Sequence, residues 1–214
     1  MTYPVALKVD YPEKLSRLTT FFRILTVIPA AVVLFFVSIA GYIMYVLSWF
    51  AILFTGKYPD SFYNFVLYWF RWSTRVGGYL LLITDKYPPF TGDEQPGYPV
   101  SIAVERPTQI SRLLVFLRLP IPPSTVSYTF PPAWRFTADW FAGFPMAFPH
   151  KVVLSFLYIA AAVILIVSWF AIIFTGKFPR SMFDFVVWVF RWNTRVTGYT
   201  YFFTDKYPPF SGEA

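Results

Sequence analysis

The sequence predicts an all-α integral membrane protein made of two tandem repeats of a helical hairpin, with about four membrane helices and short strand-like surface segments. The chain has 214 residues, of which 57% are apolar, 23% aromatic and only 14% charged. That composition is too apolar for an ordinary soluble domain. Residues 48–92 and 168–212 are identical at 29 of 45 positions at an offset of 120, which marks an internal duplication. We therefore divide the chain into a membrane repeat at 1–95 and a second at 96–214.

Each repeat begins with the alternating pattern of a half-buried strand. Apolar residues occupy every second position from Tyr3 to Val9, and residues 98–105 repeat the pattern at an offset of 95. The change of offset means that 25 residues are inserted in the second copy. A short basic amphipathic turn follows each strand, which suits the headgroup layer of a membrane. Its arginines are predicted to be interfacial: Arg17, Arg23, Arg112 and Arg118.

A long apolar run follows in each repeat, at residues 30–54 and 152–174. About 20 apolar residues in a helix are enough to cross a bilayer, so both runs are predicted to span. Gly56 and Gly176 fit a helix stop, and Pro59 and Pro179 fit the start of a second helix.

The second helix of each repeat, predicted at 60–83 and 180–203, carries one narrow polar stripe on an otherwise apolar cylinder. It either crosses the membrane with the stripe against a partner helix, or lies along the interface with the stripe toward water. We favour crossing because the faces off the stripe are apolar all round. The stripes contain Asp60, Asn64, Tyr68, Arg71, Arg75 and Gly78 in the first repeat and Arg180, Asp184, Trp188, Arg191, Arg195 and Gly198 in the second.

Two arginine pairs on these stripes are the candidate anion- or lipid-binding residues: Arg71 with Arg75, and Arg191 with Arg195. A spacing of four places both guanidinium groups of a pair on one helix face, where they can converge on one anion. Three roles are open. The arginines pair with Asp60, Asn64, Asp184 or backbone carbonyls and hold the repeats together, they bind lipid phosphate, or they line a transport path.

The insertion and its edges, residues 120–148, are rich in proline, tryptophan and phenylalanine. We interpret this segment as an aromatic belt in the headgroup region. The alternative is a lid or a docking surface for another subunit, and residues 133–142 could form a short helix within it.

Enzyme signatures are sparse. The chain has no cysteine and a single histidine, His150, so neither a metal cluster nor a histidine-based triad is expected. His150 fits an interfacial polar residue better than a catalyst, and Asp85 and Asp205 fit helix-end or turn residues better than general acids. We expect no enzyme activity, no cofactor, no metal and no nucleic-acid partner. The net charge of +7 is better matched to anionic lipid headgroups.

The ordered motifs resemble a known family. These are Tyr-Pro-Val at 3–5, Leu-Ser-Arg at 15–17, Trp-Phe-Ala-Ile-Leu-Phe-Thr-Gly-Lys-Tyr-Pro at 49–59, Arg-Trp at 71–72, Arg-Val at 75–76 and Thr-Asp-Lys-Tyr-Pro-Pro-Phe at 84–90. The set resembles the bacterial membrane-protein family known as domain of unknown function 4389, present here as two tandem copies. The resemblance implies a membrane protein and supplies no activity or site.

The sequence therefore favours a non-catalytic membrane scaffold or an accessory subunit of a larger membrane complex, with lipids and other membrane subunits as partners. The alternative is an anionic-lipid-binding or lipid-handling protein. With every helix crossing, the two hairpins run in the same direction, and eleven basic residues lie on the side of the termini and central linker against three at the hairpin tips. The positive-inside rule then predicts a multi-pass protein of the cell membrane with cytoplasmic termini and linker.

Overall fold

The computed structural model describes residues 3–120 and 145–213. This part of the chain is mostly helical and contains a small two-stranded sheet, so the predicted fold class is confirmed at that level. Its elements are β1 (Val5–Val9), α1 (Arg17–Thr26), α2 (Ile28–Thr55), α3 (Asp60–Leu80), β2 (Val100–Val104), α4 (Arg112–Phe116), α5 (Phe148–Thr175) and α6 (Arg180–Thr200). Among these, α2 and α5 are long and apolar enough to cross a membrane. The predicted belt segment and its short helix lie outside the described residues.

The ends of α2 and α5 match the predicted stop signals. Gly56 and Gly176 follow the two helices with a φ of 72°, and each donates its N–H to the carbonyl of the residue four before it. A left-handed cap of this kind favours glycine because a Cβ is strained there. Pro59 and Pro179 then precede α3 and α6, as expected.

The helices α3 and α6 end three residues earlier than predicted. Leu82 and Phe202 turn the chain with φ values of 61° and 63°, and the N–H groups of Ile83 and Phe203 close the turn on the carbonyls of Gly78 and Gly198. Glycine or asparagine is the usual residue at such a turn. An apolar residue there gives no sequence signal for a helix end, so the sequence predicts helices that continue to residues 83 and 203.

The two predicted strands pair with each other in an antiparallel ladder, with Leu7 opposite Ile102. These residues are equivalent in the two repeats, because 7 and 102 differ by the strand offset of 95. A pseudo-twofold axis therefore passes between them. The sheet buries Val5, Leu7, Val100 and Ile102 and exposes Lys8 on its outer face.

Each strand packs on a helix of the other repeat. A Cβ placed on Gly198 of α6 would lie 2.8 Å from Val5, and one placed on Gly78 of α3 would lie 2.9 Å from Val100. The tyrosines just before the strands also bond to the other repeat. Tyr3 donates to Lys206 O and Tyr98 donates to Lys86 O, both at 2.9 Å. The larger buried core accordingly draws residues from both repeats.

The helices α2 and α5 run in opposite directions. Trp169 near the end of α5 donates to Thr20 O of α1, which leads into α2, and Trp49 near the end of α2 donates to Val115 O of α4. Leu15 N also donates to Gly176 O at the end of α5. The expectation that both hairpins run in the same direction is therefore wrong. The cause is the exchanged sheet, whose twofold axis reverses one repeat against the other.

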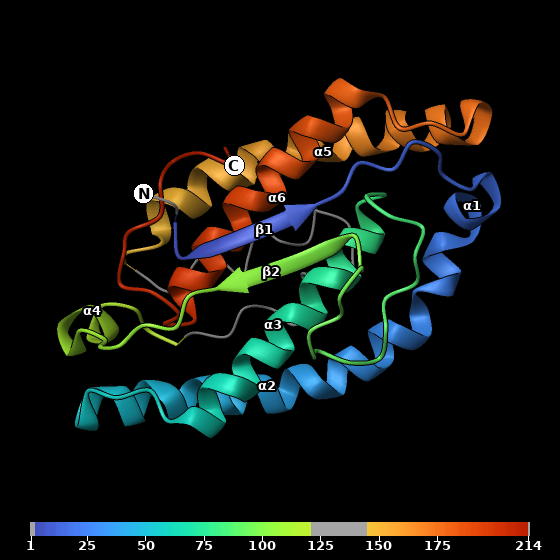
Figure 1. Cartoon of the computed structure of the whole chain (residues 1–214). Coiled ribbons are helices and arrows are strands. Elements are labelled where there is room, and N and C mark those ends of the chain that lie inside the picture. The colour runs from blue at the N-terminus through green and yellow to red at the C-terminus, as the bar shows by residue number, and fades with distance from the viewer. Residues whose placement is uncertain (1–2, 121–144, 214) are drawn as a thin grey trace.

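The elements form three layers. On α3, Gly78 faces β2 and Trp69 faces Gly41 of α2, and these positions are nine residues or about two and a half turns apart, on opposite sides of the helix. On α6, Gly198 faces β1, and Val189 packs with Leu154 of α5. Figure 1 shows the sheet in front of α3 and α6, with α2 and α5 along the two long edges.

Candidate functional site

The second arginine of each predicted pair binds the backbone of a loop that follows its helix. Arg75 donates to the carbonyls of Thr91 and Asp93, and Arg195 donates to those of Ser211 and Glu213. We call residues 84–94 and 204–213 the closing loops. The sequence left three roles open for these arginines. In the structure, Arg75 and Arg195 pair with backbone carbonyls.

The first arginine of each pair differs between the repeats. Arg71 pairs with the carboxylate of Glu94, whose side chain is 77% exposed. Arg191 donates to Leu7 O at 3.4 Å and Gly212 O at 3.3 Å, so it links α6 to the exchanged strand and to a closing loop. The stripe carboxylates have other partners, because Asp60 pairs with Arg106 and Asp184 pairs with Arg180.

A glycine lets each closing loop lie directly on its helix. A Cβ on Gly92 would be 2.0 Å from Tyr68 O, and one on Gly212 would be 1.8 Å from Trp188 O. Real Cβ atoms do not approach so closely, so a larger residue requires the loop to move. Thr91 and Ser211 fix the loops further by accepting the N–H of Asp93 and Glu213 at 3.1 Å.

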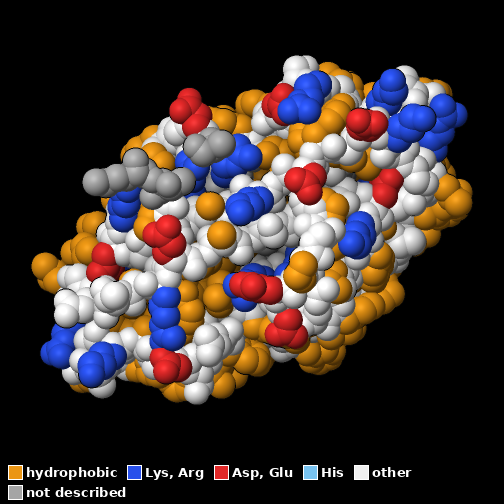
Figure 2. All heavy atoms as spheres, viewed as in Figure 1, with side chains coloured by type: hydrophobic (Ala, Val, Ile, Leu, Met, Phe, Trp, Pro, Cys, Tyr) orange, Lys and Arg blue, Asp and Glu red, His pale blue; other side chains and the backbone are white. Residues whose placement is uncertain are grey.

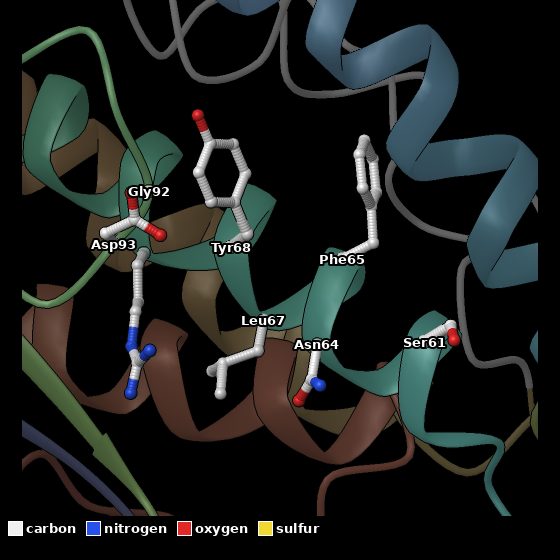
Figure 3. A pocket seen from close by; sticks show the side chains of 8 residues that line it. Ser61, Asn64, Phe65, Leu67, Tyr68, Gly92 and Asp93 are labelled. Atoms are coloured by element: carbon white, nitrogen blue, oxygen red, sulfur yellow. The ribbon is translucent and has the colours of Figure 1, made fainter.

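A shallow hollow of about 500 Å³ lies beside the first arginine pair. Ser61, Asn64 and Tyr68 line it from successive turns of α3, and Gly92 and Asp93 line it from the closing loop; Figure 3 shows the positions of these residues. Arg71 also lines it. The hollow is therefore polar on one side, and its cation already has a carboxylate partner in Glu94.

Two of the four arginines predicted to be interfacial are buried instead. Arg23 and Arg118 are 2% and 0% exposed. Arg23 pairs with Asp85 and donates to Tyr79 O and Thr84 O, and Arg118 pairs with Asp205 and donates to Tyr199 O and Thr204 O. Burial lowers the pKa of the Arg23 guanidinium, and the Asp85 charge opposes that shift.

Asp85 and Asp205 lie in the closing loops beyond the ends of α3 and α6, and the helix ends that they bind are the starts of α1 and α4. The second carboxylate oxygen of each accepts an N–H just before α1 or α4, from Ser16 or Ser111. A carboxylate at a helix N-terminus satisfies a free N–H group there and is favoured by the helix dipole. Each aspartate thus joins a closing loop to the short basic helix of its own repeat.

Arg17 and Arg112, the other two predicted interfacial arginines, are exposed. Their side chains lie beside Gly176 and Gly56, at the carboxyl ends of the helices of the opposite repeat. A cation is favourable at a helix carboxyl end. Both arginines are therefore placed to interact with those helix ends and remain open to solvent or headgroups.

His150 is buried rather than interfacial. Its Nδ1 accepts the Trp192 Nε1–H at 3.2 Å, and its ring stacks on Phe210 with centroids 3.9 Å apart. Ala30 occupies the equivalent position in the first repeat. Within the described residues, no three metal-ligating side chains come together.

A family described as a domain of unknown function, DUF4389, matches the chain over residues 17–92 and again over residues 144–212. The two segments contain 76 and 69 residues, which together exceed half of the chain. The chain belongs to this family. The two matched segments agree with two tandem DUF4389 copies. No curated protein and no solved structure matches the chain.

The buried pairs of Arg23 with Asp85 and of Arg118 with Asp205 were missed by sequence reasoning. A signal was present, because each arginine and each aspartate recurs in both DUF4389 copies within the same motif. The amphipathic turn around each arginine suggested a headgroup contact instead. Its apolar positions do face outward, as Leu18 and Ile24 are exposed, but the guanidinium turns inward.

Proposed function

We propose that this chain is a non-catalytic integral membrane scaffold or an accessory subunit of a larger membrane complex. One observation supports this most directly: the strongest polar groups of the candidate site are used by the fold itself. Arg75 and Arg195 hold the closing loops, and Arg23 and Arg118 pair with Asp85 and Asp205, whose carboxylates also bind the starts of α1 and α4. The long apolar faces of α2 and α5 are what the protein presents outward.

We place the termini and the central linker on the cytoplasmic side, because the basic residues near them favour that side when they share one face of the protein. A multi-pass arrangement would make α2 and α5 cross in opposite directions, because they are antiparallel. The hairpin tips at Lys57 and Lys177 would then lie on opposite sides of the membrane. Finding the two tips on opposite sides would therefore indicate that α2 and α5 cross the membrane.

The alternative function is binding of an anionic lipid headgroup. The hollow beside Arg71 favours it, since Ser61 and Asn64 could hydrogen-bond a phosphate there. Against it, Asp93 lines the same hollow and Glu94 already pairs with Arg71. Two carboxylates beside a single guanidinium repel a lipid phosphate, so we rank the scaffold role first.

Gentle detergent extraction followed by native mass spectrometry separates the two functions. A scaffold or accessory subunit should co-purify with other membrane proteins in fixed proportion, and the Arg71→Leu variant should keep them. A lipid-binding protein should instead carry stoichiometric anionic lipid that Arg71→Leu loses. Finding the parent chain alone, with neither protein nor lipid in fixed proportion, would count against both.

A further inference from the structure

Charge is concentrated on the sheet side of the three layers. Figure 2 shows lysine, arginine, aspartate and glutamate side chains spread over the whole face that carries β1 and β2. Lys8 is exposed on the outer surface of the sheet, and Asp93, Glu94 and Glu213 are exposed on the closing loops. This face needs water along its full length and not only at its ends.

The outermost layer on the other side is apolar. The 28 residues of α2 include no charged side chain. Large exposed apolar residues continue along its whole length, among them Val32, Ile43 and Phe50, and Phe156, Val163 and Phe170 do the same on α5. A helix that is apolar all round and buried on one side only requires a nonaqueous environment for the rest. Lipid acyl chains supply such a nonaqueous environment, and unlike a protein partner they do not need a surface of complementary shape.

If α2 crossed the bilayer perpendicular to its plane, charged side chains of the sheet side would be carried into the hydrocarbon. Trp69 of α3 lies beside the middle of α2, where it packs on Gly41 and donates to Ser38 Oγ at 2.9 Å. Arg71 is two residues further along, and its partner Glu94 is largely exposed. If α2 stood along the membrane normal, this ion pair would lie near the bilayer centre. Charged side chains are strongly disfavoured at that depth.

We propose that α2 and α5 lie along the membrane plane inside one leaflet, with the sheet and closing loops facing water. This inference rests on the membrane location proposed above. Packed helix layers are about 8–10 Å apart, and one leaflet contributes about 15 Å of hydrocarbon. The layer of α2 and α5 therefore fits within a single leaflet when α3 and α6 lie near its polar boundary. The pseudo-twofold axis then follows the membrane normal, and the two repeats sit at equal depth.

Depth measurement tests this orientation directly. The chain has no cysteine, so single spin labels can be attached at Val32→Cys, Ile43→Cys and Phe50→Cys, which share one face of α2. The full-length protein is reconstituted in phosphatidylethanolamine and phosphatidylglycerol vesicles, and label depth is read from collisions with oxygen and with a nickel chelate. We expect nearly equal depths. A crossing helix would separate the outer labels by about 27 Å along the normal, with Ile43→Cys the deepest, and would overturn the proposal.

A matched set on α5, Phe156→Cys, Val163→Cys and Phe170→Cys, should give the same flat profile. Only variants that keep the melting temperature of the parent are used. As a second arm, Lys57→Cys and Lys177→Cys are treated with a membrane-impermeant thiol reagent in right-side-out and inverted vesicles. Both should label from the same side, and labelling from opposite sides would again overturn the proposal.

Vesicle flotation separates this inference from the proposed function. A chain that floats with vesicles but shows a crossing profile remains a membrane protein with a different orientation. A folded chain that does not float would overturn both the membrane function and the in-plane orientation.

Discussion

At the scale of single residues, the arginines of α3 and α6 differ in role although they share a stripe. Arg75 and Arg195 each bind two carbonyls of a closing loop, whereas Arg71 reaches an exposed carboxylate. The guanidinium fork suits two neighbouring oxygens, which an ammonium group cannot bind with the same directed geometry. The stripe pattern is visible in the sequence, but the partners are backbone carbonyls 16 to 18 residues further along the chain, and backbone atoms leave no sequence pattern of their own.

Arg75→Leu should therefore destabilise the protein more than Arg71→Leu. The first change leaves Thr91 O and Asp93 O without their charged donor, and each such bond contributes about 1.5–3 kcal/mol. The second removes an ion pair whose Glu94 side chain is 77% exposed, and about 0–1 kcal/mol is typical for a pair with such access to solvent. Unfolding followed by circular dichroism in mild detergent measures both. Equal losses would contradict the assignment of Arg75 to the loop.

Gly92→Ala should be destabilising by about 1–3 kcal/mol, the usual cost of overpacking. The new Cβ would meet Tyr68 O at 2.0 Å. Gly77→Ala is the matched control, because its Cβ would lie 3.5 Å from Phe190 in ordinary contact. Alanine there should be neutral, or stabilising by about 0.5–1 kcal/mol through helix propensity. A melting temperature unchanged by Gly92→Ala would show that the loop is not held against the helix.

At the scale of elements, sequence patterns located the strands and both long helices. The periodicity of residues 3–9 and the glycines after α2 and α5 are local signals, so they were readable without knowing the fold. The ends of α3 and α6 were not readable, because Leu82 and Phe202 adopt a glycine-like conformation while their side chains are buried in the core. The role of α1 was misassigned at Arg23, whose partners lie 56 to 62 residues away.

Deleting residues 120–144 should leave a folded membrane protein. Arg118 and Pro145 face each other in an isolated β-bridge, so the two ends of the deletion are already close. The first repeat also connects α1 to α2 without such a segment. We expect the circular dichroism spectrum to keep its helical content and the melting temperature to fall by only a few degrees. Failure of the shortened chain to insert would make the segment part of the core.

At the scale of the whole molecule, the duplication was evident but its geometry was not. An offset in a sequence says that two units are alike and nothing about how they face each other. The antiparallel pairing of β1 with β2 decides that, and it depends on contacts between residues nearly a hundred positions apart. The expectation of repeats running in the same direction came from treating each hairpin as an independent unit.

The exchange of strands predicts how the protein behaves when cut. A chain of residues 1–95 alone lacks α6, on which β1 packs, and a chain of residues 96–214 lacks α3 beneath β2. Produced together, the halves should assemble and elute as one complex in size-exclusion chromatography with light scattering. Produced alone, each should aggregate or pair with itself. A stable monomer of either half would contradict the exchanged arrangement.

The twofold axis between Leu7 and Ile102 has a further consequence for how the two halves can change. In a symmetric pair of identical chains, any substitution appears on both sides of the axis and must be tolerated twice. Joining the copies in one polypeptide removes that restriction, because each half can mutate by itself. The histidine at 150 opposite an alanine at 30, and the 25 residues gained by one half alone, are differences that only a fused pair can carry.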